Sequence, residues 1–310
     1  LMLGLTSVVV GFLLLSRVET YLMFIAGTAF IGIGAGLYFT PMRTVVANLF
    51  VENRGQAFGI TSAAGTTGSI LAAGFVTISL AMIGWRGTFL PIAVVLVLVM
   101  LFVHFLSREA YIVSRFSLNS WITLKRVLAT PALRILLLVY TFEAFTWSGA
   151  LNFLPTYLQV TKNFSPALAN ASFASVFVVG IIVGPTSGYV SDRFERIPIT
   201  IGGLLVAGVG LSGLIHFDTV PLIVGATGLF AAGVMTFPTV MQAHLLDILP
   251  EGREDTDFGM FKTIYTAFAS FGPVFVGYVA SSHSYTDAYI GLGVLLGSSA
   301  ILLIVFQWSR

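Results

Sequence analysis

A carboxylate lies deep inside one of the apolar stretches of this 310-residue sequence. Glu143 follows Arg134, the basic residue at the start of that stretch, by nine residues, which corresponds to about 13 Å along a helix. Placing an ionisable side chain this deep in hydrocarbon costs free energy, so such a residue is a candidate for a functional role. Tyr140 and Trp147 share the helix face of Glu143, and Asn152 follows further along. These four side chains are the candidate site for a substrate cation or a proton, and a hydrogen-bonded structural Glu is the alternative.

Other chemistry has little support in the sequence. It contains no Cys, no His-Glu-x-x-His, no Gly-x-Ser-x-Gly and no phosphate-binding loop. His244 and Asp247 stand three residues apart, but further metal ligands are missing beside them. We therefore expect no enzyme activity, no cofactor and no metal site.

The amino-acid composition indicates whether the protein that holds these residues lies in water or in a lipid bilayer. Charged residues make up 9% of the chain, hydrophobic residues 57%, and the mean hydropathy is +0.97. Soluble domains are about a quarter charged, so a soluble enzyme and a disordered chain are excluded. A net charge of +2 without a basic stripe also excludes nucleic acid as a partner. The sequence is that of a polytopic membrane protein.

Apolar runs of about 20 residues can cross a bilayer as helices. Because the runs are continuously apolar rather than alternating, they predict an all-α protein and not a barrel. The ten expected spans are 1–16, 21–42, 57–83, 87–106, 134–158, 168–190, 197–216, 220–245, 258–280 and 285–308.

Basic residues predict the orientation of these spans. Alternate connections, together with the C-terminal residue, contain 12 of the 15 Lys and Arg residues. Cytoplasmic loops collect basic residues, so we expect the C-terminus in the cytoplasm and, with ten spans, the N-terminal end there as well. The expected location is the plasma membrane.

The longest connection, 107–133, falls on the predicted cytoplasmic side. Trp121 and Leu128 fall at helical spacing opposite Lys125 and Arg126. This pattern favours an amphipathic linker at the membrane surface, with a partly ordered loop as the alternative.

The two sides of this linker resemble each other. Phe58-Gly59 and Phe258-Gly259 each follow a short charged turn and open a span rich in small or hydroxyl residues, the third and the ninth. The sequence thus indicates a repeat of six spans, which is a transporter architecture.

The turn after the sixth span reads Gly188-Tyr-Val-Ser-Asp192-Arg193-Phe-Glu-Arg196. This Gly-x-x-x-Asp-Arg-x-x-Arg pattern resembles the signature loop of the major facilitator superfamily (MFS), which joins the second and third helices of that family and recurs between the eighth and ninth. The resemblance implies that the ten spans are the third to twelfth helices of the family. The chain would then be a fragment that lacks the first two of twelve transmembrane helices.

The resemblance implies a two-bundle architecture and a function. Residues 1–106 would be the four-span remnant of the N-terminal bundle, 107–133 the linker and 134–310 the C-terminal six-helix bundle. We expect a monomeric secondary active transporter that moves a small organic solute by alternating access, with the lipid bilayer as solvent and protons as a candidate coupling ion. The alternative is a non-transporting polytopic protein, either a sensor or a membrane-embedded enzyme.

The resemblance also implies a cytoplasmic gate formed by Gly188, Asp192, Arg193, Arg196 and Arg54. In the pseudo-symmetric arrangement of the family, the loop after the sixth span lies against the cytoplasmic start of the third. That start carries Arg54 and free backbone N–H groups. We expect Asp192 to approach one of these partners, while Arg193 and Arg196 hold the loop; ordinary loop charges are the alternative.

Overall fold

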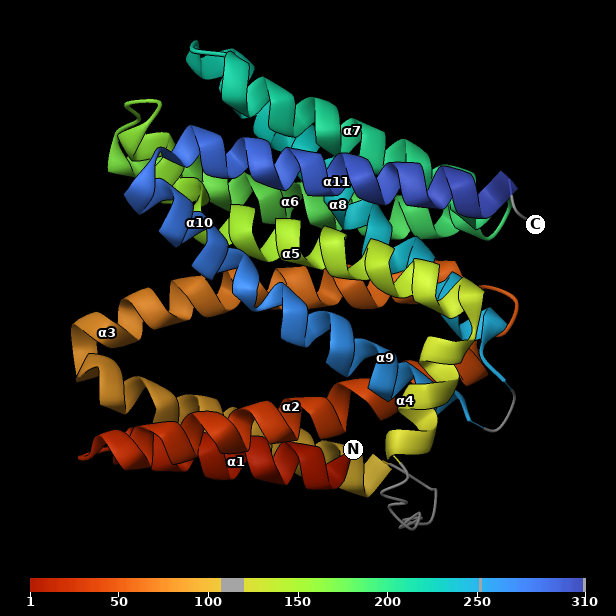
Figure 1. Ribbon diagram of the computed structural model, residues 1–310. Coiled ribbons are helices and arrows are strands. Elements are labelled where there is room, and N and C mark those ends of the chain that lie inside the picture. The colour runs from red at the N-terminus through yellow and green to blue at the C-terminus, as the bar shows by residue number, and fades with distance from the viewer. Residues whose placement is uncertain (107–119, 251–252, 309–310) are drawn as a thin grey trace. The chain divides into compact units, whose positions relative to one another are not determined.

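The computed structural model describes residues 1–106, 120–250 and 253–308 (Figure 1). Helices are the only regular secondary structure within these ranges, as the all-α prediction requires. They are α1 (Met2–Ser16), α2 (Tyr21–Leu49), α3 (Arg54–Leu106), α4 (Ser120–Ala129), α5 (Pro131–Val160), α6 (Pro166–Ser191), α7 (Arg196–His216), α8 (Val220–Ile248), α9 (Glu254–Ala269), α10 (Phe271–Ser282) and α11 (Tyr285–Trp308).

Seven helical segments of the described ranges are long and apolar enough to cross a membrane by length and composition. The other predicted spans also coincide with helix, namely α1, the first part of α3 and most of α5. Part of the predicted linker, 107–119, lies outside the described residues, whereas its later part forms α4.

The third and fourth predicted spans are joined into α3 across a sharp bend. Gly84 adopts φ 71° and ψ 173° at this bend. That backbone region is essentially restricted to glycine, so Gly84 permits the chain to reverse between two helical segments without a separate loop.

The predicted ninth span is interrupted. Its two pieces are α9 and α10, which meet at Ser270. Pro273 explains the interruption, because it has no N–H to donate to Ala269 and its ring disfavours a continuous helix at that turn.

The chain divides into two compact units. Unit 1 comprises Leu1–Asn48 and Ser69–Leu118, and unit 2 comprises Leu49–Gly68 and Asn119–Arg310. The first turns of α3 thus group with unit 2, whereas the sequence repeat assigns them to the first bundle.

In unit 1, α1 and α2 pack with their backbones in contact. A Cβ atom on Gly4 would lie 2.8 Å from the carbonyl oxygen of Gly34, so side chains larger than hydrogen do not fit there. The Arg86 guanidinium lies over the Trp85 ring and its Nε donates a 2.7 Å hydrogen bond to the carbonyl of Val18. Arg86 therefore ties the bend of α3 to the turn after α1.

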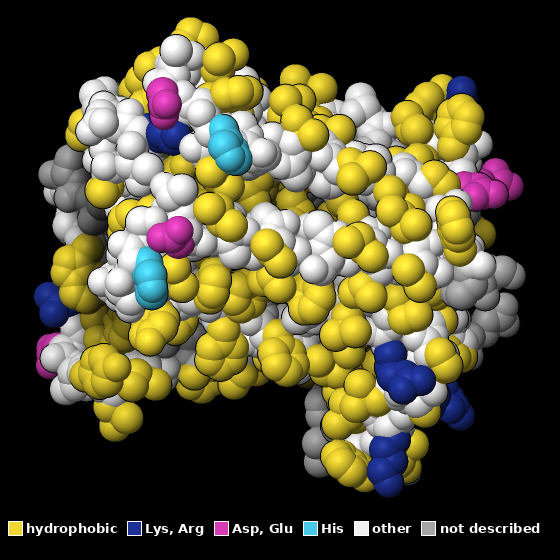
Figure 2. Space-filling model, turned by 45° about the horizontal axis from the view of Figure 1, so that its top comes forward, with side chains coloured by type: hydrophobic (Ala, Val, Ile, Leu, Met, Phe, Trp, Pro, Cys, Tyr) yellow, Lys and Arg dark blue, Asp and Glu magenta, His cyan; other side chains and the backbone are white. Residues whose placement is uncertain are grey.

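In unit 2, α5 is the central helix. It packs against α11, α9, α10 and α6, while α7 forms a tight hairpin with α8 (Figure 1). Figure 2 shows hydrophobic side chains over most of the visible surface and few charged ones. An exterior of this kind is typical of a protein that faces lipid.

The two Phe-Gly pairs of the repeat occupy matching positions. Phe58 and Phe258 each lie four residues after the first residue of their helices, α3 and α9, and both side chains are buried. The two Phe-Gly pairs of the sequence repeat therefore occupy equivalent positions at the starts of two helices.

Candidate functional site

The Asp192 carboxylate binds the start of α3. Its Oδ1 accepts a 2.8 Å hydrogen bond from the backbone N–H of Gly55, and its Oδ2 accepts one of 2.8 Å from Gln56. These N–H groups belong to the first helical turn, which has no intrahelical acceptor for them and carries the positive end of the helix dipole. A carboxylate that is only 8% exposed is thereby stabilised by backbone groups.

The start of α3 and the end of α6 meet through glycines. A Cβ atom on Gly188 would overlap the carbonyl of Gly55, and one on Gly184 would lie 3.1 Å from the carbonyl oxygen of Gly59. Two glycines four residues apart on each helix thus let the backbones touch. This close approach brings Asp192, four residues after Gly188, within reach of the α3 amides.

Of the two partners expected for Asp192, the backbone N–H groups bind it, whereas Arg54 pairs with another carboxylate. Asp247, at the end of α8, pairs with Arg54 through one oxygen and with Arg196 through the other. Arg196 also lies 3.8 Å from Asp192. Three segments distant in sequence are therefore joined by one bridging carboxylate, and we call Arg54, Gly55, Gln56, Asp192, Arg196 and Asp247 the Asp192 cluster.

The remaining predicted gate residue, Arg193, points elsewhere. Its guanidinium lies 4.1 Å from the centroid of the Tyr189 ring, one turn back on α6. Beside the cluster is a hollow of roughly 660 Å³ that is lined in part by Glu195, His244 and Gln307. The Asp192 cluster therefore has a hollow on one side, lined by both polar and apolar side chains.

Glu143 lies in the middle of unit 2, on the buried face of α5, and is 7% exposed. Its carboxylate makes no hydrogen bond or ion pair within the described part of the chain. Tyr140, one turn earlier, contacts the rings of Phe237, Phe261 and Tyr265, with centroids 4.9–5.2 Å away. An aromatic cluster from α5, α8 and α9 therefore lies one turn from the buried carboxylate.

The other two candidates on α5 are less closely associated with Glu143. Trp147 is half-buried. Asn152 donates a 2.8 Å hydrogen bond from Nδ2 to the carbonyl of Ser148 in its own helix. The structure thus places Tyr140 and Glu143 on one buried face, whereas Asn152 bonds within α5.

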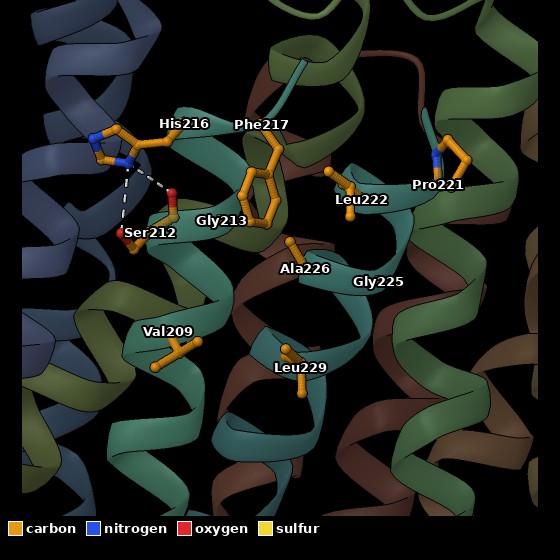
Figure 3. Close-up of a pocket in the computed structure, with 10 residues that line it drawn as sticks. All are labelled: Val209, Ser212, Gly213, His216, Phe217, Pro221, Leu222, Gly225, Ala226 and Leu229. Carbon is orange, nitrogen blue, oxygen red and sulfur yellow. Dashed lines mark hydrogen bonds between the residues drawn. The ribbon is translucent and has the colours of Figure 1, made fainter. Parts of the chain in front are cut away.

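An apolar groove of roughly 580 Å³ lies between α7 and α8 near the turn that joins them (Figure 3). Apart from backbone groups, its polar atoms come from Ser212 and His216, and His216 Nδ1 is 2.9 Å from the Ser212 carbonyl oxygen. None of the predicted site residues lines it. The lining suits an acyl chain better than a polar solute.

Sequence reasoning missed two acidic residues that the structure places at contacts between helices. Asp247 was considered only as part of an incomplete metal site. Asp257, in α9, is fully buried and pairs with Arg126 of α4. The sequence signal for each was a carboxylate within one or two turns of a helix end, which does not identify a partner more than 50 residues away.

Comparison with known proteins identifies the family. The family model of the Major Facilitator Superfamily matches residues 1–185 and 136–310. The chain is 26% identical over 303 residues to the glycerol-3-phosphate transporter of Bacillus subtilis (strain 168), covering 87% of this chain and 67% of that protein. It is 23% identical over 296 residues to the nitrite extrusion protein of the same strain, covering 92% of this chain and 72% of that protein.

Solved structures share the fold. The Escherichia coli fucose:proton symporter matches with a TM-score of 0.76 at 16% identity, over 98% of this chain and 84% of that one. The human organic anion transporter MFSD10 matches with a TM-score of 0.77 at 18% identity, over 97% and 76% of the two chains. The chain belongs to the major facilitator superfamily. It is a multi-pass integral membrane protein and a secondary transporter, as the turn at Asp192 and the six-span repeat predicted.

Proposed function

We propose that the protein moves a small organic solute by alternating access and that the Asp192 cluster is its cytoplasmic gate. The observation that carries the proposal is the pair of hydrogen bonds from Gly55 and Gln56 to Asp192. They join a turn of the second half of the repeat to a helix of the first half. Contacts of this kind can be made in one state and broken in the other as the two halves rock.

The side assignment rests on the basic residues. Arg54, Arg193, Arg196 and Arg253 surround this end of unit 2, and such enrichment is typical of cytoplasmic loops. The proposal therefore places the Asp192 cluster and the C-terminus in the cytoplasm of a cell whose plasma membrane holds the protein as a monomer. It assigns no catalytic step to the chain.

Glu143 is the proposed coupling group. A buried carboxyl without a hydrogen-bond partner among the described residues can exchange its proton with substrate or water when the site opens. Tyr140 and Trp147 would provide aromatic surface for the solute, and Asn152 a polar contact further along α5. This assignment favours a neutral or cationic solute that moves with protons.

A second candidate is an anion carrier. Two relatives of this chain are named for glycerol-3-phosphate and nitrite, which are both anions. Lys262 lies within α9, one residue after Phe261 of the aromatic cluster, and a base at that position would complement an anion.

Transport by the full-length protein in proteoliposomes distinguishes the candidates. Uptake and efflux of a panel containing fucose, glycerol-3-phosphate, nitrite and an organic cation are measured with and without a pH gradient. If a neutral or cationic solute moves only with the pH gradient, and Glu143→Gln abolishes this movement, the result supports proton-coupled transport of such a solute. If an anion is transported, and Lys262→Gln abolishes this transport while Glu143→Gln does not, the result supports the anion carrier. The exposed Glu19→Gln, outside the Asp192 cluster, is the matched carboxyl control.

A further inference from the structure

The position of the short helix α4 is fixed by its short connection to α5. It ends at Ala129, and α5 begins at Pro131 after the single residue Thr130. α5 is 30 residues long, enough to cross a bilayer. Because Arg134 marks the basic end of α5, α4 must lie next to the headgroups on that side.

One face of α4 packs against unit 2. Thr123 and Val127 are buried on this face, and Arg126 extends from it to Asp257 of α9. The Asp257 side chain is fully buried, three residues after the start of α9. A buried ion pair therefore links α4 to the beginning of α9.

In this ion pair, Arg126 and Asp257 each make a hydrogen bond through only some of their polar atoms. The second carboxylate oxygen of Asp257 and the Nε of Arg126 have no hydrogen-bond partner within the described residues. A buried carboxylate that is held through one oxygen depends strongly on that contact, because no second partner compensates its charge when α4 moves away.

The opposite face of α4 is exposed and suited to a lipid surface. Trp121, Ile122 and Leu128 are 64%, 57% and 43% exposed. Lys125 was expected on the face opposite Trp121 and Leu128, but it lies among these exposed side chains, with its Nζ 5.4 Å from the centroid of the Trp121 ring. The sequence of α4 contains no Asp or Glu. Tryptophan with apolar and basic neighbours is typical of the interface of a bilayer with anionic headgroups.

We propose that the Trp121–Lys125 face of α4 binds anionic phospholipid headgroups and that this binding keeps α4 latched to α9 through Arg126 and Asp257. Bilayer composition then acts on the start of α9 through a helix outside the transport site. When anionic lipid is absent, α4 leaves the surface more readily and the buried face at Val127 opens. The inference does not depend on which solute the protein carries.

Fluorescence of Trp121 tests the lipid contact directly. In the full-length protein, the other tryptophans of this chain, Trp85, Trp147 and Trp308, are replaced by Phe, and any further tryptophan likewise. Quenching in bilayers is then titrated with acyl-brominated phosphatidylglycerol or acyl-brominated phosphatidylcholine. We expect phosphatidylglycerol to be preferred about fivefold, the contribution of roughly one basic residue at a charged surface.

Two variants make this titration specific. Lys125→Ala should reduce the preference to near one, whereas Arg253→Ala, an exposed base at the start of α9 but outside α4, should leave it unchanged. Equal quenching by both lipids, or a Trp121 that neither lipid quenches, would overturn the proposal.

Cysteine accessibility tests the latch without disrupting it. The 310 residues contain no Cys, and any further Cys of the full-length protein is replaced. Val127→Cys then reports opening of the buried face, and Leu128→Cys serves as the exposed control. Maleimide labelling of Val127→Cys should be several-fold slower in bilayers with phosphatidylglycerol than in phosphatidylcholine alone. In detergent, Leu128→Cys should be labelled faster than Val127→Cys, which verifies that α4 is folded and packed against unit 2. Equal labelling of Val127→Cys in the two bilayers would show that lipid does not control the latch.

Discussion

The carboxylate of Asp192 and the backbone N–H of Gly55 lie 2.8 Å apart, although 137 residues separate them in sequence. This contact exists because Gly188 allows the end of α6 to touch the start of α3. The carboxylate of a short charged turn thereby acts as an external cap for the start of α3.

Removal of the Asp192 charge should weaken this cap. Asp192→Asn keeps one acceptor oxygen but loses the interaction of a charge with the helix dipole, which is worth ~1–2 kcal/mol in a partly buried setting. We expect an approximately tenfold shift of the equilibrium towards the state that is open to the cytoplasm.

A disulfide reporter measures this shift. Gly184→Cys and Ser62→Cys suit it, because a Cβ on Gly184 would lie 3.7 Å from the Cβ of Ser62, within disulfide range. Asp192→Asn should slow oxidative crosslinking of this pair. Asp218→Asn, 89% exposed and outside the cluster, is the control. An unchanged crosslinking rate in Asp192→Asn would refute the gate.

The bridging role of Asp247 predicts a charge-swap rescue. Arg54→Asp or Asp247→Arg alone places like charges together and should lower the crosslinking rate, whereas the double variant should restore part of it. Because Asp247 is 37% exposed, the coupling energy should not exceed about 1 kcal/mol. A double variant no better than the worse single variant would show that these side chains do not interact.

Gly188 should tolerate no side chain. Gly188→Ala would force a methyl group into the Gly55 backbone, and overpacking of this kind destabilises a protein by about 1–3 kcal/mol. The melting temperature in detergent should fall. Gly202→Ala in α7 is the matched control, since a Cβ there meets nothing within 4 Å. Equal melting temperatures for both variants and the parent would contradict the close contact.

Glu143→Gln tests proton coupling. The amide cannot release a proton at accessible pH, so transport driven by a pH gradient should be lost, whereas counterflow exchange of substrate should continue. Both assays use the same proteoliposomes, with quantified protein. If gradient-driven transport survives in a well-expressed variant, another group carries the proton.

Much of the fold followed from the sequence because the hydrocarbon core imposes long apolar helices. The repeat placed Phe58 and Phe258 at matching helix positions, and the approach of Asp192 to the start of α3 followed from the family arrangement. The break between α9 and α10 was missed although Pro273 gave a readable signal. Asp247 and Asp257 could not be assigned, since carboxylates near helix ends have many possible partners until packing brings one close.

The α3–α6 contact offers the most direct test of alternating access. In the full-length protein, the Ser62→Cys, Gly184→Cys pair is oxidised in proteoliposomes, and substrate uptake is measured before and after reduction. Our account predicts that the crosslinked protein does not transport and that reduction restores uptake to the level of the single-Cys variants. Undiminished uptake by fully crosslinked protein would contradict it.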